Sequence, residues 1–239
     1  KVEESLNELF PDFPVLRVDR DSTSRVGSWQ KIYDQIQKSE PMILLGTQML
    51  AKGHHFPYVT LVTILDIDSG LLSVDFRATE RTAQLIVQVA GRAGRGDKKG
   101  EVYLQTLRPD HPLLNTLIEK DYRAFAKQTL KDRQAALMPP CRYAIMIRCE
   151  SKSQEENLKF LTEMTQTLRQ QSEASLIDIW GPIPAPMERK AGRYQAHVVL
   201  LSLERAKMHF YVHQWWNILL HSKPSSMKIT IDVDPQELS

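Results

Sequence analysis

Short segments rich in apolar residues alternate with helical segments through the first 138 residues, and this order limits the possible folds more than anything else in the sequence. Apolar residues three and four positions apart predict helices at residues 1–10, 29–38, 77–90 and 111–137. The predicted strands lie at residues 15–18, 42–45, 59–65 and 101–106. Apolar strands that alternate with helices indicate a parallel sheet covered on both faces. Ligands of such sheets bind beyond the carboxyl ends of the strands.

The run Met138-Pro139-Pro140 interrupts this alternation, and the segments that follow have another order. We expect the order β-α-β-β-α-β, with elements at residues 143–149, 154–171, 176–180, 194–203, 204–220 and 227–233. This is the order of the split β-α-β, or ferredoxin-like, arrangement. The sequence therefore predicts two domains, an α/β domain over residues 1–138 and an α+β domain over residues 139–239.

The composition is that of an ordinary globular protein, with 25% charged residues and a net charge of +2. No apolar run has the length that a membrane span needs.

We expect Cys141 and Cys149 to be reduced thiols of a cytoplasmic protein, because cytosolic disulfides are rare. No Cys/His cluster supplies the four ligands of a zinc site, so no metal is expected. Since the chain begins at Lys1 rather than at a methionine, we expect a piece of a longer protein.

The strongest candidate site lies at the end of the helix predicted over residues 77–90. Its sequence, QVAGRAGR, starts at Gln88 and places two arginines, Arg92 and Arg95, three positions apart among glycines. Two forked guanidiniums can bind one phosphate, and glycines let the backbone approach it closely. An arginine that reaches a γ-phosphate from a neighbouring lobe stabilises the transition state. The alternative is a glycine-rich helix end with solvated arginines.

A second candidate site begins where the strand predicted over residues 42–45 ends, on the ligand-binding edge. Its sequence, GTQMLAKGHHFP, starts at Gly46. Backbone amides at a glycine turn, with the Thr47 hydroxyl and the Lys52 charge, can hold a phosphate of a nucleic-acid backbone. An ordinary strand-to-helix turn is the alternative reading of this segment.

The two segments together, about forty residues apart, resemble motifs V and VI of superfamily 2 helicases. Other stretches resemble one family of these closely, the primosomal replication-restart helicases, or PriA family. The resemblance covers essentially the whole chain and is carried by residues 65–68, 75–81, 180–189 and 231–235. It implies a RecA-like second helicase lobe over residues 1–138 and an S10-like form of the ferredoxin-like fold over residues 139–239.

The family resemblance also implies an activity, which is ATP-dependent 3′→5′ DNA unwinding at stalled forks and reloading of the replisome through primosome proteins. Its implied catalytic residues, which face the nucleotide, are Gln88, Arg92 and Arg95. Its implied cofactor-binding positions are Gly46, Thr47, Gly53 and Gly91, and its implied DNA contacts here are Gln48 and Lys52. ATP and Mg²⁺ would be shared with a first lobe, since no GxxxxGK[ST] phosphate loop occurs in the chain. The family's Zn²⁺ segment would precede Lys1, and the chain alone is expected to be inactive.

Basic residues of the second domain are candidates for binding. Arg189, Lys190 and Arg193 form a basic loop, either a DNA contact or a solvated hairpin tip. Arg205 and Lys207 lie in the first turn of a predicted helix, where the helix dipole disfavours cations, so an acidic partner would stabilise them. The resemblance suggests the acidic tail of single-stranded DNA-binding protein as that partner.

Two further groups of the last predicted helix have plainer interpretations. His209 and His213 are four positions apart, but no third ligand is spaced to complete a metal site. Core packing is the expected role of the helix aromatics, which are Phe210, Tyr211, Trp215 and Trp216.

Two other functions compete with a catalytic half-site of a DNA helicase. A different superfamily 2 translocase, such as a RecG-like remodeller, shares the two motifs but does not explain residues 180–235. A non-catalytic DNA-binding and protein-docking module is the second alternative. A phosphate-loop lysine in the sequence upstream of Lys1 would distinguish the helicase from this module.

Overall fold

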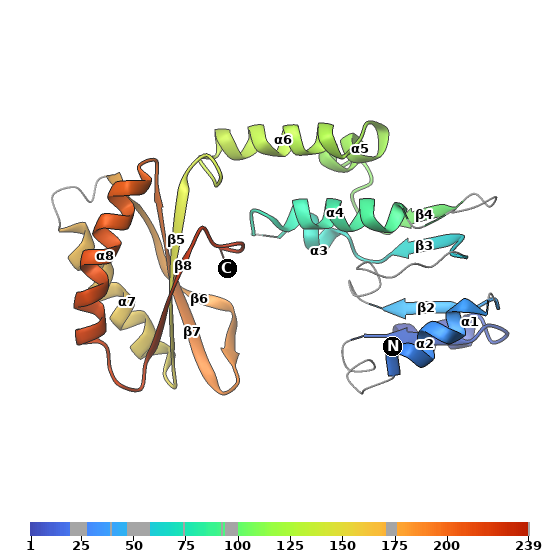
Figure 1. Ribbon diagram of the computed structural model, residues 1–239, viewed down its shortest axis with the longest axis horizontal. Helices are drawn as coiled ribbons and strands as arrows, with labels where there is room; N and C mark the ends of the chain where they lie inside the picture. The colour runs from blue at the N-terminus through green and yellow to red at the C-terminus, as the bar shows by residue number, and fades with distance from the viewer. Residues whose placement is uncertain are drawn as a thin grey trace. The chain divides into compact units, whose positions relative to one another are not determined.

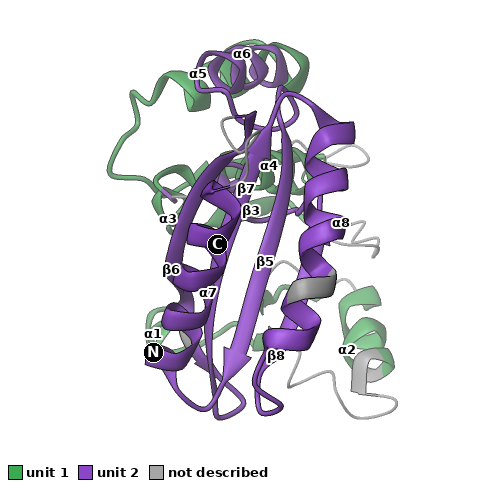
Figure 2. Cartoon of the chain, turned by 90° about the vertical axis from the view of Figure 1, so that its left-hand side faces the viewer, with its two compact units in different colours: residues 1–72, 79–124 green, residues 73–78, 125–239 purple. Residues whose placement is uncertain are grey.

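The computed structural model describes residues 1–19, 28–38, 40–46, 58–73, 75–91, 93, 100–170 and 176–238. The chain divides into two compact units (Figure 2), of which unit 1 comprises residues 1–72 and 79–124 and unit 2 comprises residues 73–78 and 125–239. The domain boundary predicted near residue 138 stays a prediction. None of the described helices combines the length and the apolar character that crossing a membrane takes.

Unit 1 contains two pairs of parallel strands (Figure 1). The strands are β1 (Val15–Val18) with β2 (Ile43–Gly46), and β3 (Leu61–Ile64) with β4 (Glu101–Leu104). Parallel strands at these four places were expected from the apolar segments, and this prediction is confirmed with small differences at the ends. Its helices are α1 (Val2–Leu9), α2 (Ser28–Gln37), α3 (Asp68–Leu71), α4 (Ala78–Ala90) and α5 (Pro112–Glu119).

The single helix predicted over residues 111–137 is wrong, because the structure divides it into α5 and α6 (Tyr122–Ala135). After α5, Lys120 leaves helical geometry with a ψ of −90°. The Asp121 side chain then accepts a hydrogen bond from the Ala124 amide at 2.6 Å and caps the start of α6. An aspartate that satisfies a free amide favours a new helix start, and apolar spacing alone does not reveal this.

Unit 2 contains a four-stranded antiparallel sheet with the strand order β6-β7-β5-β8. The elements in chain order are β5 (Tyr143–Ser151), α7 (Gln154–Arg169), β6 (Asp178–Lys190), β7 (Arg193–Ser202), α8 (Arg205–Ser222) and β8 (Lys228–Val233). The predicted order of strands and helices, β-α-β-β-α-β, is therefore confirmed for this part of the chain.

The strand β6 is much longer than the strand predicted over residues 176–180, and it passes through Pro182, Pro184 and Pro186. It lies at one edge of the described sheet and pairs only with β7. Proline is tolerated in an edge strand, because the amides on its outer side have no strand to bind. Prolines make such a segment unlike a strand in the sequence, so the predicted strand ended too early.

The core of unit 2 lies between the sheet and the two helices α7 and α8, which cover one face of it (Figure 1). Ile147 of β5, Leu161 of α7 and Trp215 of α8 are all at most 1% exposed in this core. On the opposite face a smaller apolar cluster, against which Leu238 packs, consists of Ala144, Met146, Val199 and Leu201. Burial of this apolar area is the main contribution to the stability of the unit.

The core role predicted for the aromatic residues of α8 holds for three of the four. Trp215 is buried, and Tyr211 and Trp216 pack partly buried against the same core. The prediction is wrong for Phe210, which is 57% exposed and contacts Tyr211 edge to face, with ring centroids 5.6 Å apart. Phe210 immediately precedes Tyr211, and consecutive helical residues lie about 100° apart around the axis, so both cannot face the core equally.

A two-residue turn joins β6 to β7, with Lys190 paired to Arg193 across it. Both central residues have positive φ, 49° at Ala191 and 80° at Gly192. Positive φ at both positions is the requirement of a type I′ turn, whose twist matches that of the strands. The basic loop expected from the sequence is therefore the tip of a tight hairpin.

Replacing Ala191 by asparagine should raise the free energy of unfolding by about 1 kcal/mol, because an alanine with positive φ is strained and asparagine tolerates this region. Urea denaturation followed by circular dichroism measures the change. Gly192→Ala is the matched control and should lower stability, although a Cβ there would meet no atom within 4 Å. An unchanged urea midpoint in Ala191→Asn would show that the turn is not strained.

Candidate functional site

The first candidate segment begins in the last turn of α4. Buried Ala83 and Ile86 anchor this helix in unit 1, whereas Gln88 is exposed near its end. Gly91 follows the helix, and its amide donates to the Val87 carbonyl at 3.0 Å. The structure therefore presents Gln88 and Gly91 at one helix terminus, as the sequence predicts. Arg92 and Arg95 lie outside the described residues.

The second candidate segment starts at the carboxyl end of β2. Gly46 is the last residue of that strand and is paired with Val18, the last residue of β1. The segment therefore begins at the strand edge where α/β proteins bind ligands. The other residues predicted to act there lie outside the described residues, and their roles stay predictions: Thr47, Gln48, Lys52 and Gly53.

Side chains link the loops that follow β3 and β4, a feature that sequence reasoning missed. Asp68 accepts hydrogen bonds from the Leu107 amide and the Thr106 hydroxyl, both at 2.7 Å. These two hydrogen bonds hold the pKa of Asp68 below its usual value, and the bond from the Leu107 amide has the larger effect. The Asp66 amide also donates to the Gln105 side chain at 3.2 Å. These bonds fix the carboxyl edge of the pair β3–β4.

Two guanidiniums contact one aromatic ring in the segment that precedes α4, a feature that sequence reasoning missed. In unit 2, the guanidinium carbons of Arg77 and Arg133 lie 5.3 and 4.9 Å from the centre of the Phe76 ring. Arg133 also donates to the Phe76 carbonyl at 3.2 Å. Asp75, which is 6% exposed, accepts from the Arg77 amide at 2.8 Å. This cluster holds the segment that leads into α4 against α6.

The basic hairpin of unit 2 presents its three cations in different ways. Arg189 and Lys190 are exposed, and the Arg189 guanidinium lies over the Tyr194 ring, 5.5 Å from its centre. Arg193 is half-buried and donates to the carbonyls of Glu150 and Ser226 at 3.1 and 2.6 Å. Arg189 and Lys190 are therefore accessible to solvent, whereas Arg193 is engaged with the backbone of its own unit.

The start of α8 differs from the sequence expectation, in which an acidic partner had to stabilise two cations. Arg205 forms an ion pair with Asp234 at 3.4 Å, and Lys207 forms one with Glu204 at 3.0 Å. The Arg205 guanidinium also lies over the Tyr143 ring, 5.6 Å from its centre. Because these pairs are exposed, each contributes at most about 1 kcal/mol. The chain itself supplies the carboxylates, so the helix dipole alone does not require a partner.

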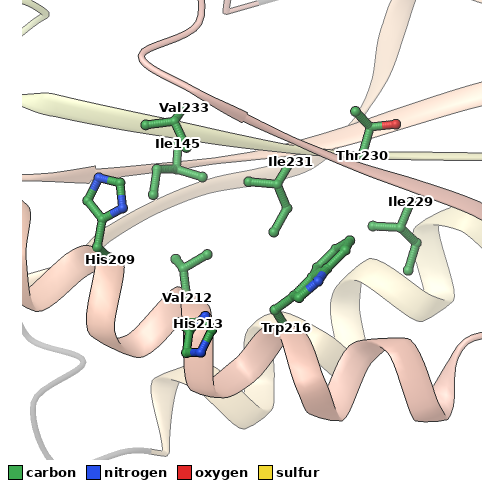
Figure 3. Close-up of a pocket in the computed structure, with 9 residues that line it drawn as sticks. All are labelled: Ile145, His209, Val212, His213, Trp216, Ile229, Thr230, Ile231 and Val233. Atoms are coloured by element: carbon green, nitrogen blue, oxygen red, sulfur yellow. The ribbon is translucent and has the colours of Figure 1, made fainter.

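A groove of about 430 Å³ runs between α8 and β8 (Figure 3). Its apolar lining includes Trp216, Ile229 and Ile231, and His209 and His213 lie along the helix side. Among the described residues, no group of three His, Cys, Asp or Glu side chains could hold a metal ion.

The two cysteines form no disulfide in the structure. Cys149 is fully buried in the core of unit 2, and this burial raises the pKa of its thiol to about 12. The buried thiol is therefore protonated at neutral pH and acts as a small apolar core residue.

Comparison with known proteins finds two family matches along the chain. Residues 1–97 match the family described as helicase conserved C-terminal domain, and residues 134–236 match the primosomal protein N C-terminal domain. Over all 239 residues the chain is 45% identical to replication restart protein PriA of Haemophilus influenzae, of which it covers 32%. The proteins of the same name from Synechocystis sp. and Bacillus subtilis are 36% and 33% identical over 98% of the chain, which covers 28% and 29% of them. The chain spans about a third of the length of these relatives.

Proposed function

Because the chain belongs to the PriA family of replication restart proteins, we propose that it forms the second motor lobe and the C-terminal domain of a DNA helicase that acts in replication restart. The observation that carries this proposal is the end of α4. Exposed Gln88 and Gly91 lead there into the arginine motif, within the residues that match a helicase C-terminal domain. The match of residues 134–236 to a primosomal domain favours this family over another superfamily 2 translocase.

We propose that Gln88, Arg92 and Arg95 face an ATP molecule whose phosphates are held mainly by a first lobe. Gly46, Thr47, Gly53 and Gly91 would supply close backbone approach, and Gln48 and Lys52 would contact DNA. The position of Gly46 at the carboxyl end of β2 and of Gly91 after α4 supports a phosphate-binding role. Mg²⁺, when bound, neutralises charge on the phosphates.

Several finer features belong to the same proposal. The antiparallel order β6-β7-β5-β8, with both helices on one face, supports a ferredoxin-like, S10-like class for residues 139–239. The family resemblance supports 3′→5′ unwinding, a Zn²⁺ segment before Lys1 and a cytoplasmic location. The partners would be DNA, other primosome proteins and single-stranded DNA-binding protein.

We propose two binding surfaces in unit 2. The hairpin residues Arg189, Lys190 and Arg193 would contribute to DNA binding. Arg205 and Lys207 would meet the acidic tail of single-stranded DNA-binding protein. An acidic tail would compete there with the carboxylates of Asp234 and Glu204, so we expect weak affinity that falls with salt.

The chain alone should hydrolyse no ATP, because hydrolysis needs a phosphate loop and a Mg²⁺ carboxylate together with the arginines. The measurement is phosphate release with and without single-stranded DNA. The intact parent protein, assayed in parallel, should show DNA-stimulated hydrolysis. DNA-stimulated hydrolysis by the chain, retained through a final gel-filtration step and abolished by Arg95→Ala, would overturn the proposed division between two lobes.

A further inference from the structure

On the face of the unit 2 sheet opposite α7 and α8 lies the segment that follows β8, residues 234–238 (Figure 1). This segment is called the strap below, and that face of the sheet the outer face. The chain turns at Asp234, whose φ is 52°, and the Asp234 amide donates to the Ala144 carbonyl of β5 at 2.9 Å. Pro235 is buried, and Leu238 packs against the smaller apolar cluster described above. The strap is therefore attached to the sheet at both of its ends.

One polar side chain is enclosed between the strap and the sheet. His197 belongs to β7 and lies two residues before Val199, so both side chains point to the outer face. His197 is 1% exposed, and its ring hydrogen-bonds to the backbone of Leu238. Its Nε2 atom is buried and has no hydrogen-bond partner among the described residues. The imidazole therefore links the strap to the sheet through one of its two nitrogens.

This environment suits the neutral imidazole and disfavours the imidazolium. A second ring proton would make Nε2 a charged donor in a buried place where the described residues offer it no acceptor. Burial first, and the positive charge of Arg148 second, lower the pKa of His197, and the hydrogen bond to Leu238 opposes them only in part. Once the strap lifts and water reaches the ring, the pKa should return to its ordinary value of about 6.5.

The charged groups around His197 come from the neighbouring strands and from the strap. Arg148 of β5 is in register with His197, and Asp232 of β8 lies 3.6 Å from the Arg148 guanidinium. On β6 the residue in register is Ile183, which carries no charge. The strap contributes two carboxylates, Asp234 and Glu237. The charge that acts on His197 is that of Arg148, and it opposes a second positive charge beside it.

We propose that the strap opens and closes on the outer face, and that neutral His197 is the latch that holds it closed. The closed strap accommodates the uncharged ring, whereas the open strap leaves the ring hydrated and able to take a proton. Protonation therefore favours opening, and opening uncovers the apolar cluster on which Leu238 packs. This switch makes unit 2 sensitive to acidification, and it does not depend on the motor role proposed above.

The direction of the pH dependence follows from proton binding. The closed state binds fewer protons than the open state, so the closed strap is most stable above about pH 6.5 and loses stability as the pH falls below it. With a ring that stays neutral when closed and has an ordinary pKa when open, the ratio of open to closed strap should rise about tenfold between about pH 7.5 and about pH 5.5.

Thiol labelling of the full chain tests the switch. Val199→Cys places a thiol at a position that is 2% exposed, and Cys141→Ser removes the half-buried native thiol. Labelling rates with a dipyridyl disulfide are divided by those of the urea-unfolded chain at the same pH. The corrected rate at position 199 should rise about tenfold over the same pH range. Cys149, which is fully buried on the helix side of the sheet, reports global unfolding and should stay unlabelled.

Two histidine variants in this background decide the role of the latch. The side chain introduced by His197→Gln stays neutral, so the corrected rate at position 199 should be the same at both ends of the pH range. His213→Gln is the matched control, because it removes an exposed histidine of the same unit, and it should keep the tenfold rise. A tenfold rise that persists in His197→Gln would show that another group is responsible, and the proposal would be wrong.

Leu238→Ala tests the strap itself. It removes the apolar contact of a partly buried side chain, so position 199 should be labelled roughly tenfold faster at neutral pH. Labelling at position 199 that only matches that of Cys149 would overturn the proposal, because global unfolding alone would then uncover the outer face. A fast rate without pH dependence in the starting chain would overturn it too, since the strap would not close. If circular dichroism shows that Val199→Cys does not fold, Met146→Cys in the same cluster takes its place.

Discussion

Arg95→Ala in the intact parent protein should lower ATP hydrolysis about a thousand-fold or more. An arginine presented to the γ-phosphate from a second lobe stabilises the charge that develops in the transition state, and such residues contribute about 10³–10⁵ in rate. Arg92→Ala should behave similarly, because the two guanidiniums are expected to act on the same nucleotide. DNA-stimulated phosphate release, measured at saturating ATP, gives the change.

Two comparisons make this prediction specific. ATP binding, measured with a fluorescent nucleotide, should weaken much less than hydrolysis, since the phosphates are held mainly by the other lobe. Arg95→Lys should restore little activity, because a point charge does not reproduce the planar fork of a guanidinium. Near-normal turnover in Arg95→Lys would contradict the role given to this residue.

Trp215→Ala should lower the free energy of unfolding of unit 2 by about 3–5 kcal/mol. Trp215 is 1% exposed at the centre of the core between α8 and the sheet, so its removal would leave a large cavity. Phe210→Ala is the control on the same helix and should change stability by about 1 kcal/mol or less, because Phe210 is 57% exposed.

Urea denaturation of the chain, followed by far-ultraviolet circular dichroism, measures both variants. Each substitution replaces an aromatic residue of the same helix by alanine. The difference between their losses of unfolding free energy therefore reports burial rather than helix propensity. Similar losses in both variants would contradict the packing described for α8.

Apolar periodicity was enough to predict the parallel strands of unit 1 and the order of elements in unit 2. Two elements departed from it for local reasons. Asp121 caps a new helix and divides residues 111–137 into α5 and α6. Prolines concealed most of β6, which tolerates them only because it lies at an edge of the sheet. Strand order and hydrogen bonding of side chains are tertiary properties, so apolar spacing cannot predict them.

In the candidate site, too, local positions could be predicted from the sequence, whereas contacts between side chains and distant segments could not. Motif spacing predicted Gln88 at a helix end and Gly46 at a strand end, and the structure places both there. From the sequence, Arg193 was interpreted as one more cation of a loop. In the structure, its guanidinium donates hydrogen bonds to two backbone carbonyls of distant segments. No carboxylate partner was predicted for Arg205 or Lys207. In the structure, Asp234 pairs with Arg205 and Glu204 pairs with Lys207. For Arg193 and Arg205 the missing information was a partner far along the chain, whereas Glu204 lies only three residues before Lys207.

The most direct test of the proposed motor role is photo-crosslinking from α4 to ATP in the intact parent. A benzophenone amino acid replaces Gln88 in one protein and Gln84, one turn earlier and also exposed, in the other. The proposed role predicts that radiolabelled ATP attaches at position 88, only with Mg²⁺, and that excess unlabelled ATP prevents it. Position 84 should remain unlabelled. Equal labelling at both positions, or none at position 88 in a protein that still binds ATP, would contradict the claim that this helix end faces the nucleotide.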